Sequence, residues 1–460
     1  MSKAFRDDQP EQRLQMPPNL EEWVPEGHLA RFVSDVIEEL DLNEVYAAYE
    51  DDGRGLAAYH PLLMMKLLFY GYCVGKASSR KLEQATYEDV AVRYLAANQH
   101  PDHDTIAAFR RRHLAALAGL FGQVLRMCQK AGLVKLRHVA VDGTKIRANA
   151  SRYRGVTYER MEREQQELEE EIGRWLAHAE AVDEAEDAQY GKGRRDNELP
   201  PELRTRERRL VKIRELKAEL ERQAREAAAK KKAQVEKHLA ERRAEEERRG
   251  RRFGGRVPQV PDIERARPKP QAQRNLTDSE SRIMKDGATN SFQQCYNAQV
   301  AVDGGCQVIV AARLTQAEHD REQLVPNLQA AERNLGRKVE EVSADSGYYD
   351  PDHLDTEYLK GVRLYLPPVR EPRAGPKASR WARNGPLLER LREQMNQPEA
   401  KAAYQLRQGI VEPVFGQIKQ WRGLRQFLLR GIDKVSGEWQ MICATHNLLK
   451  LYRFENARTA

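Results

Sequence analysis

Apolar residues recur at helical spacing along the first part of the chain. Residues 61–70 (PLLMMKLLFY) predict a strong helix with proline in its first turn. Another helix is predicted with Ser79 as its cap, and the capping-box spacing of Thr86 and Asp89 predicts the start of a third. We therefore expect residues 1–132 to form an all-helical region.

A basic cluster ends the last of these predicted helices. Residues 100–113 (HPDHDTIAAFRRRH) predict a turn that leads into a helix with three successive arginines. Several short helices with a basic last one are typical of a helix-turn-helix-like unit, in which Arg110, Arg111 and Arg112 would contact DNA. The alternative is a helical bundle whose arginines face water, and the pattern favours neither.

Strands are predicted on both sides of a long charged stretch, from β-branched or alternating runs at 137–144, 295–302, 306–314, 339–344 and 362–366. The first run is expected to end at Asp142 and the fourth at Asp345, each before a small residue. The second and third runs flank Asp303-Gly304-Gly305 and predict a β-hairpin with a tight turn.

Helices are predicted between and after these strands, at 318–335, 351–360, 386–395, 402–420 and 436–452. With the charged stretch set aside, the order of elements is that of an RNase H-like fold, in which three antiparallel strands come first and the fourth lies beside the first. The sequence therefore predicts an α/β domain, an RNase H-like mixed sheet with flanking helices, over residues 133–154 and 275–460.

The intervening stretch is dense in glutamate, arginine, lysine and alanine. Its apolar residues recur at spacings of three, four and seven, which predicts two antiparallel helices with a thin apolar seam. An arginine- and proline-rich linker follows over residues 251–273. Residues 155–274 are thus predicted to be a helical-hairpin insertion, whose mixed charges favour a spacer or dimerisation arm over a DNA clamp.

Charge and cysteine usage narrow the class of protein. The net charge of +7 favours an anionic partner, most commonly nucleic acid, although a solvated charged surface explains it equally well. The five cysteines include no C-x-x-C pair, so a zinc ribbon is unexpected. No segment has the pattern of a secretory signal or a membrane span, and we expect a cytoplasmic protein without membrane contact.

Three carboxylates are candidates for phosphodiester chemistry, because two divalent ions such as Mg²⁺ need about three carboxylates on rigid elements. Asp142 and Asp345 would meet at one sheet edge if their strands are parallel neighbours, and a cation would relieve their repulsion. Glu412 is expected in the first turn of a helix or at a kink, because Pro413 has no N–H to donate. Lys419 would project from the same face and hold a DNA phosphate.

Simpler explanations exist for several acidic residues. An aspartate before glycine is often only a turn residue, and Asp303 is well explained in this way. His319, Asp320 and Glu322 are better explained as capping residues at a helix start than as metal ligands. The pair Asp142 and Asp345 gains weight because the predicted fold brings their strands together.

The chain resembles the DDE transposases of bacterial insertion sequences, in the group with an InsH-type N-terminal domain. The motifs that carry the resemblance lie at 60–113, 138–151 (HVAVDGTKIRANAS), 277–282 (TDSESR), 344–348 (ADSGY), 404–419 and 422–425 (RGLR). Relative to the pattern common in that family, the spacing Tyr404-x₂-Arg407-x₄-Glu412-x₆-Lys419 has one added residue between arginine and glutamate.

The resemblance implies an activity and a set of site residues. Asp142, Asp345 and Glu412 would be catalytic and would bind two Mg²⁺ ions, for which Mn²⁺ substitutes. DNA contacts would come from these motifs too, at Lys145, Arg147, Tyr404, Arg407, Lys419 and Arg422. The protein would bind the inverted repeats at the ends of its element, hydrolyse those ends and transfer the 3′ hydroxyls to target DNA, as a homodimer or larger synaptic complex. The alternatives are an RNase H-like nuclease or resolvase and a non-catalytic DNA-binding scaffold.

Overall fold

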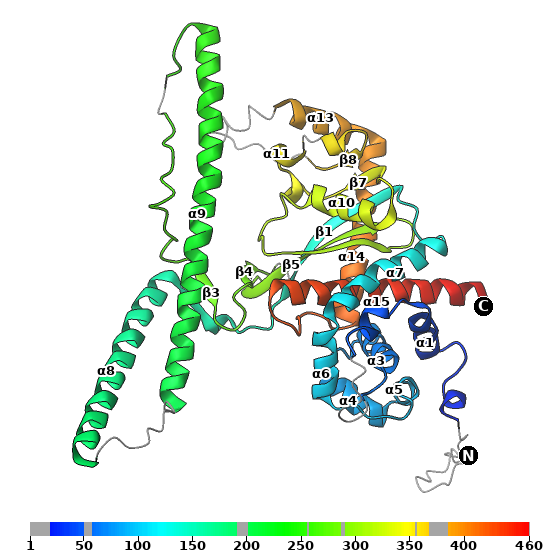
Figure 1. Ribbon diagram of the computed structural model, residues 1–460. Coiled ribbons are helices and arrows are strands. Elements are labelled where there is room, and N and C mark those ends of the chain that lie inside the picture. Colours follow the sequence, from blue (N-terminus) through cyan, green and yellow to red (C-terminus); the bar gives the residue numbers. More distant parts are fainter. Residues whose placement is uncertain are drawn as a thin grey trace, which may run out of the picture. The chain divides into compact units, whose positions relative to one another are not determined.

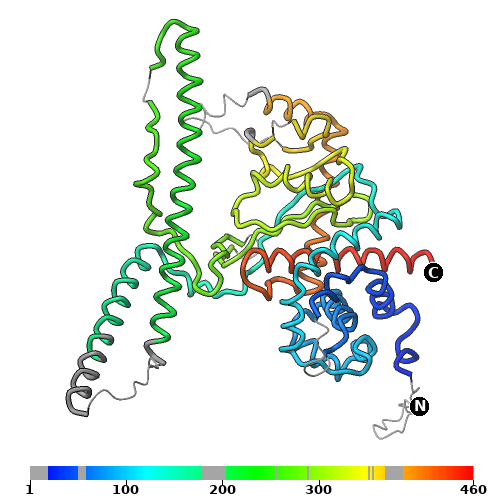
Figure 2. Tube along the Cα trace, in the orientation of Figure 1, coloured from blue at the N-terminus to red at the C-terminus, as the bar shows by residue number. Residues whose placement is uncertain are grey.

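The computed structural model describes residues 19–49, 58–190, 201–254, 257–286, 290–354, 357–367 and 385–459 of the chain (Figure 1). Backbone contacts divide the chain into two compact units. The first consists of Met1–Ala148, Met284–Ser291 and Cys295–Ala460, and the second of Asn149–Ile283 and Phe292–Gln294. Figure 2 traces the chain through both units by residue number.

The amino-terminal region is helical, as predicted. Its α-helices are α1 (Leu29–Glu39), α2 (Asn43–Tyr46), α3 (Pro61–Cys73), α4 (Ser79–Glu88), α5 (Val90–Leu95), α6 (His103–Arg112) and α7 (Leu114–Lys130). The predicted capping box is wrong: the Thr86 hydroxyl donates to the Glu83 carbonyl, and Asp89 itself caps α5 by accepting from the Ala91 amide at 3.0 Å. Ser79 is the first residue of α4, and Ser78 holds the cap position.

The carboxyl-terminal helix α15 (Ile432–Thr459) packs against α7 and α3 (Figure 1). Buried contacts join these helices, such as that of the Cys73 thiol with the Thr445 carbonyl and that of the Cys128 thiol with the Asn447 carbonyl. Residues 1–132 therefore share one compact unit with the sheet that follows them in the sequence.

A mixed sheet forms the centre of the first unit. Its strands are β1 (His138–Arg147), β4 (Arg282–Lys285), β5 (Phe292–Asp303), β6 (Ile309–Thr315), β7 (Glu341–Ser343) and β8 (Arg363–Tyr365). The order is β4-β5-β1-β7-β8, with β6 paired to β5. β5 pairs antiparallel with β1 and β6, whereas β7 pairs parallel with β1 and β8. With its flanking helices, this sheet gives an α/β fold.

The first strand does not end at Asp142, as the sequence predicted. β1 continues for five more residues and pairs with β5 as far as Arg147 opposite Cys295. Thr144 and Ile146 are β-branched and suit an extended strand. Asp142 therefore lies inside β1.

The helices beside the sheet are α10 (Leu324–Leu335), α11 (Pro351–Leu354), α13 (Gly385–Asn396) and α14 (Pro398–Gly416), followed by a π-helical turn η5 (Gln417–Trp421). Of the two positions predicted for Glu412, the first turn of a helix is wrong, because α14 begins at Pro398; Pro413 lies inside the helix, as the alternative of a kink requires. Glu412 is thus near the carboxyl end of α14. The proline- and arginine-rich stretch 367–385 predicts a loop, and most of it lies outside the described residues.

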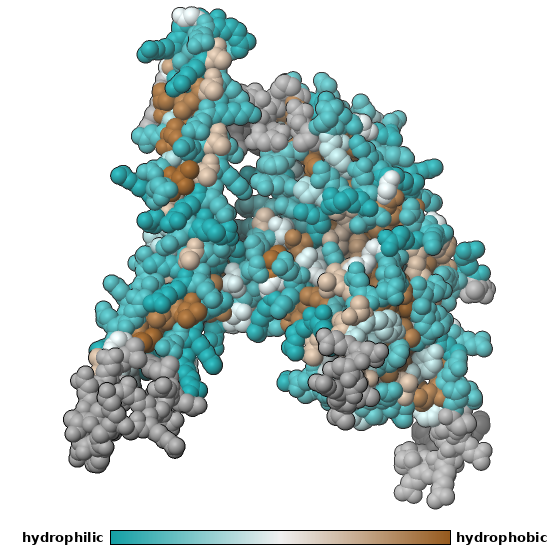
Figure 3. Space-filling view, viewed as in Figure 1, coloured by the Kyte–Doolittle hydropathy of each residue, from teal (hydrophilic) through white to brown (hydrophobic). Residues whose placement is uncertain are grey.

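The second unit is the predicted helical hairpin. Helices α8 (Tyr158–Tyr190) and α9 (Pro201–Arg249) pack together, and β2 (Gly155–Thr157) pairs antiparallel with β3 (Gln273–Asn275). The apolar seam between the helices contains Met161, Leu168, Ile172, Leu210, Ile213, Leu216 and Leu220. Outside that seam the hairpin surface is largely hydrophilic (Figure 3). No described helix has both the length and the apolar character needed to cross a membrane.

Candidate active site

Asp142 and Asp345 are brought together by parallel strands. β1 pairs with β7 so that Ala140 lies opposite Ser343, and each aspartate lies two residues further along. The backbone of Asp345 is still extended, so both side chains project from the same face at the same level. The charge of Asp345 acts on Asp142 and helps to raise its pKa, which agrees with this closeness.

The Asp142 carboxylate is mostly buried and forms an ion pair with the guanidinium of Arg407. It accepts from the Gly143 amide at 2.8 Å, and the Arg407 Nη1 donates to its Oδ2 at 3.0 Å. Burial, with a smaller contribution from the charge of Asp345, raises the pKa of Asp142 to about 6, although Arg407 and the Gly143 amide act in the opposite direction. The pair of carboxylates thus concentrates negative charge that Arg407 balances only in part.

Two hydrogen bonds hold the turn that carries Asp345 in place. Asp345 accepts from the Gly347 amide at 2.8 Å and caps the short helix Ser346–Tyr348. Tyr348 is fully buried and its hydroxyl donates to the Gln299 Oε1 at 2.5 Å. A buried aromatic with a satisfied hydroxyl fixes the backbone next to Asp345.

A network of polar side chains lies beside Gly143, and the sequence did not predict it. The Asp320 Oδ1 accepts from the Asn297 Nδ2 at 2.7 Å and from the Gln299 Nε2 at 2.6 Å, and it lies 3.8 Å from the Lys145 Nζ. Capping is therefore the wrong explanation for Asp320, because α10 begins only at Leu324.

This network also explains the glycine after Asp142. A Cβ at Gly143 would meet the Gln299 amide and would lie 2.9 Å from the Asp320 Oδ1. The Asp-Gly pair in the sequence could have suggested a close approach of other side chains inside a strand. The prediction that the strand ends at this pair is wrong, because β1 continues to Arg147.

Glu412 does not join the two aspartates. It is exposed, whereas the buried face of α14 carries Arg407, Ile410, Val411 and Val414. Glu412 is five residues from Arg407 and so points about 140° away from it on an α-helix. Within the described part of the chain, no three histidine, cysteine, aspartate or glutamate side chains lie close enough to hold a metal ion together.

Some predicted DNA contacts lie along β1 and α14. The Lys419 Nζ donates to the Thr144 hydroxyl at 2.9 Å and to the Lys145 carbonyl at 3.0 Å, and burial lowers the pKa of Lys419. The Arg407 guanidinium lies over the Tyr404 ring, with its Cζ 5.9 Å from the ring centroid. Arg147 is exposed at the end of β1.

Two predicted DNA contacts, Arg110 and Arg422, are contradicted by burial, since they are only 5% and 3% exposed. The Arg110 Nη1 donates to the Ala77 carbonyl at 3.0 Å, and the Arg422 Nη1 donates to the Thr445 hydroxyl at 2.9 Å. These guanidiniums stabilise contacts inside the protein and are not available to a phosphate.

Arg111 and Arg112 remain exposed on α6. The Arg112 Cζ lies 5.4 Å from the ring centroid of Tyr49. Of the three arginines in the basic cluster, these two are therefore accessible to a phosphate.

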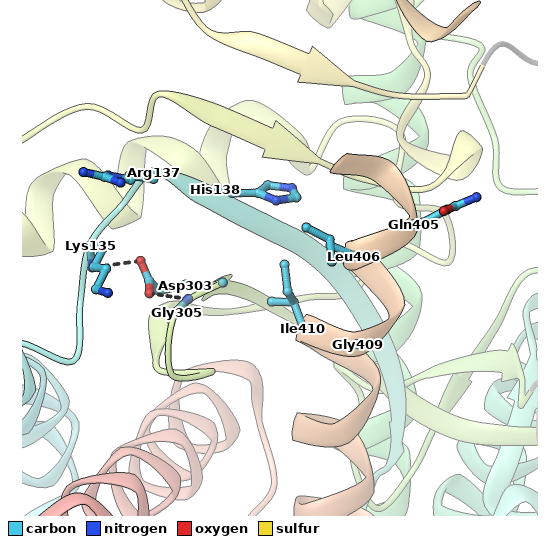
Figure 4. A pocket seen from close by; sticks show the side chains of 10 residues that line it. Lys135, Arg137, His138, Asp303, Gly305, Gln405, Leu406, Gly409 and Ile410 are labelled. Atoms are coloured by element: carbon cyan, nitrogen blue, oxygen red, sulfur yellow. Dashed lines mark hydrogen bonds between the residues drawn. The ribbon is translucent and has the colours of Figure 1, made fainter. Parts of the chain in front are cut away.

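A pocket of about 480 Å³ lies at the other end of β1, near His138, Leu406 and Ile410 (Figure 4). Asp303 lines this pocket, but its carboxylate is already hydrogen-bonded within the protein. It accepts from the amides of Lys135 at 3.1 Å, Leu136 at 2.6 Å and Gly305 at 2.9 Å. The explanation of Asp303 as a hairpin-turn residue is confirmed.

Replacement of Arg407 by glutamine should tighten the binding of Mn²⁺ to the DNA-free protein by about tenfold. The guanidinium competes with a metal for Asp142, and its removal leaves the pair of carboxylates with less compensating charge. Isothermal titration calorimetry measures the change, with the exposed Arg111→Gln as the matched control. Weaker binding by Arg407→Gln would mean that Arg407 supports the metal site and does not compete for it.

Comparison with known protein families gave two matches. Residues 18–112 match a family described as a transposase domain (DUF772), and residues 379–452 match a transposase DDE domain. No curated protein and no solved structure matched the chain. The second match includes α14 and the first part of α15, whereas β1 and β7 lie between the two matched regions.

Proposed function

We propose that the chain is a DDE transposase of the insertion-sequence type that moves its own element, because both matched regions are described as transposase domains. It would bind the terminal inverted repeats, hydrolyse the DNA at those ends and transfer the freed 3′ hydroxyls to target DNA. Two ends must be held at once, so the active species would be a homodimer or a larger complex.

The observation that carries this proposal is the pairing of Asp142 with Asp345. They lie at one level on parallel neighbouring strands, and each is a candidate ligand of a divalent ion. The strand order also supports it, because three antiparallel strands followed by a fourth parallel to the first are the arrangement expected of an RNase H-like fold.

The residues present fit a divalent cation. Both aspartates offer hard oxygen donors. The raised pKa of Asp142 reflects the burial of its carboxylate and, to a smaller extent, the charge of Asp345, and a bound cation would stabilise the ionised form. We propose that Asp142, Asp345 and Glu412 hold two Mg²⁺ ions, with Mn²⁺ as a substitute. When bound, such ions neutralise the phosphoryl group and stabilise the attacking and leaving oxygens.

Glu412 must move to take part in such a site. Pro413 lacks the N–H that an α-helix uses, and the π-helical turn Gln417–Trp421 follows directly. The hydrogen bonding of the helix is thus already interrupted on both sides of Gly416. We propose that this end of α14 rearranges when DNA binds and turns Glu412 toward Asp142.

The remaining exposed or half-buried candidates would position DNA. We propose phosphate contacts for Lys145, Arg147, Tyr404, Lys419, Arg111 and Arg112, as salt-dependent, sequence-independent interactions. Arg407 would leave Asp142 when a metal binds and would then be free to reach a phosphate.

The test is a cleavage and joining assay with the purified full chain. The substrate is a plasmid that carries the DNA flanking the gene, incubated with Mg²⁺, with Mn²⁺ or with EDTA. We expect metal-dependent cuts at both ends of the element and joining of the 3′ ends to a second plasmid. Metal-dependent cutting without joining would identify a nuclease or resolvase, and binding without cutting would identify a non-catalytic DNA-binding protein.

The affinity for Mn²⁺ should depend on pH in a direction set by Asp142. A carboxyl group binds a metal only when ionised, and the pKa of Asp142 is raised to about 6. Affinity should therefore rise about tenfold per pH unit below pH 6 and level off above pH 7. Calorimetry at pH 5, 6, 7 and 8 gives the profile. Equal affinities at pH 5 and pH 7 would show that Asp142 is not a ligand.

A further inference from the structure

Trp421 is a large aromatic side chain that the fold leaves in solvent. It is the last residue of the π-helical turn Gln417–Trp421, and 64% of it is exposed. By contrast, Ile418 in the same turn and Arg422 directly after the turn are buried. Burial of an aromatic of this size stabilises a fold strongly, so an exposed position invites a functional explanation.

The π-helical turn is the cause of the exposure. Val411, Val414 and Ile418 form the buried face of α14 at spacings of three and four residues. An uninterrupted α-helix would place both Trp421 and Arg422, three and four residues after Ile418, on or beside that face. The wider turn shifts the register, so Arg422 takes the buried position and Trp421 turns outward.

The exposed ring has a guanidinium over it, and further basic residues lie near it in the chain. The Arg453 Cζ lies 5.8 Å from the ring centroid of Trp421, and Lys419 is two residues away in the same turn. The Arg425 Nε donates to the Lys419 carbonyl at 2.9 Å, and the Arg147 amide donates to the Arg425 carbonyl at 3.2 Å. We call Arg147, Lys419, Trp421, Arg425 and Arg453 the Trp421 patch.

The patch lies close to the candidate active site. Arg147 and Asp142 are on the same strand, five residues apart, which corresponds to about 17 Å. One strand of DNA rises by about 3.4 Å per nucleotide, so the patch is about five nucleotides from a phosphate held at Asp142. Side chains alternate along a strand, so Arg147 projects from the face opposite Asp142. The link to the face of Asp142 is Lys419, whose Nζ donates to the hydroxyl of Thr144, two residues from Asp142.

We propose that Trp421 stacks on an unpaired base of the DNA end while Arg147, Arg425 and Arg453 hold the neighbouring phosphates. The proposal rests on the DNA-processing function proposed above. An aromatic platform among cations is the usual arrangement for binding single-stranded nucleic acid. The positive charge of the patch favours a polyanion over a protein surface.

The test measures DNA binding by Trp421 variants of the full chain in EDTA, so that no cleavage occurs. The probes are a 20-nucleotide single strand that contains 2-aminopurine and a blunt 20-base-pair duplex. Trp421→Leu keeps apolar bulk without an aromatic face, and it should weaken single-strand binding between about 5-fold and about 100-fold. Trp421→Phe should lose less, and quenching of 2-aminopurine should disappear only in Trp421→Leu.

Controls separate this inference from the proposed function. Tyr87 is 59% exposed on α4, and Tyr87→Leu should leave binding of both probes unchanged. Blunt-duplex binding by Trp421→Leu should change less than about twofold.

If the wild type binds neither probe, the proposed function itself fails. If the wild type binds both probes and Trp421→Leu binds them equally well, only the stacking inference is overturned. A loss of self-association by Trp421→Leu, with DNA binding unchanged, would assign the ring to an interface between copies of the chain.

Discussion

Asp142→Asn and Asp345→Asn are each expected to lower the rate of metal-dependent DNA cleavage by about three orders of magnitude or more. Each change removes a carboxylate from the pair on β1 and β7, and the charge stabilisation supplied through such a pair is worth several kcal/mol, about 4 kcal/mol for a thousandfold effect. Amide replacements keep the size of the side chain. Single-turnover cleavage of end DNA at saturating protein measures the rate.

The control for these variants is Glu340→Gln, which neutralises an exposed carboxylate just before β7. It should retain the cleavage rate of the wild type. Binding of the end DNA should survive in both aspartate variants, because phosphate contacts come from other residues. Cleavage at the wild-type rate by either variant would remove that aspartate from the catalytic group.

Glu412→Gln is expected to reduce cleavage as strongly but to leave the Mn²⁺ affinity of the DNA-free protein unchanged. The reason is the exposed position of Glu412, which points away from Arg407 and from Asp142 in this structure. Only a rearrangement of the end of α14 brings it into the site. Cleavage assays and calorimetry on the same preparation separate the two effects.

The matched control for this prediction is Glu399→Gln, an exposed glutamate in the first turn of the same helix. It should be active and should bind Mn²⁺ normally. If Glu412→Gln weakens Mn²⁺ binding before DNA is added, Glu412 already reaches the metal and no rearrangement is needed. If Glu412→Gln cleaves normally, the third carboxylate is another residue.

The elements that follow from local pattern were predictable from the sequence. The hairpin seam of Met161, Leu168 and Ile172 follows from its spacing, and the strand that precedes Asp345 follows from a β-branched run. Helical periodicity and β-propensity are properties of neighbouring residues, so tertiary contacts did not alter these elements.

Features that depend on distant partners were not predictable. Nothing in the run Arg110, Arg111 and Arg112 reveals that the first arginine is buried, because its partners Tyr72 and Ala77 lie more than thirty residues away. The apolar stem of arginine allows either placement. The same holds for Arg422, whose guanidinium donates to the Tyr72 carbonyl and the Thr445 hydroxyl, which are distant from it in the sequence.

The candidate site contains one feature that local pattern predicts and one that depends on residues distant in the sequence. The pairing of Asp142 with Asp345 follows from two strand patterns and one rule about strand order. The network of Asn297, Gln299 and Asp320 does not, because it is assembled from β5 and the segment before α10. The glycine after Asp142 was the sequence feature that indicated a close approach of other side chains. Which side chains approach it is known only from the structure.

The central claim is that Asp142 and Asp345 together bind a divalent cation, and Mn²⁺ titration of the full chain at pH 7.5, followed by electron paramagnetic resonance, tests it most directly. The account predicts saturable binding by the wild type and by Glu340→Gln, and the loss of that binding in both Asp142→Asn and Asp345→Asn. Undiminished Mn²⁺ binding by the two aspartate variants would contradict it.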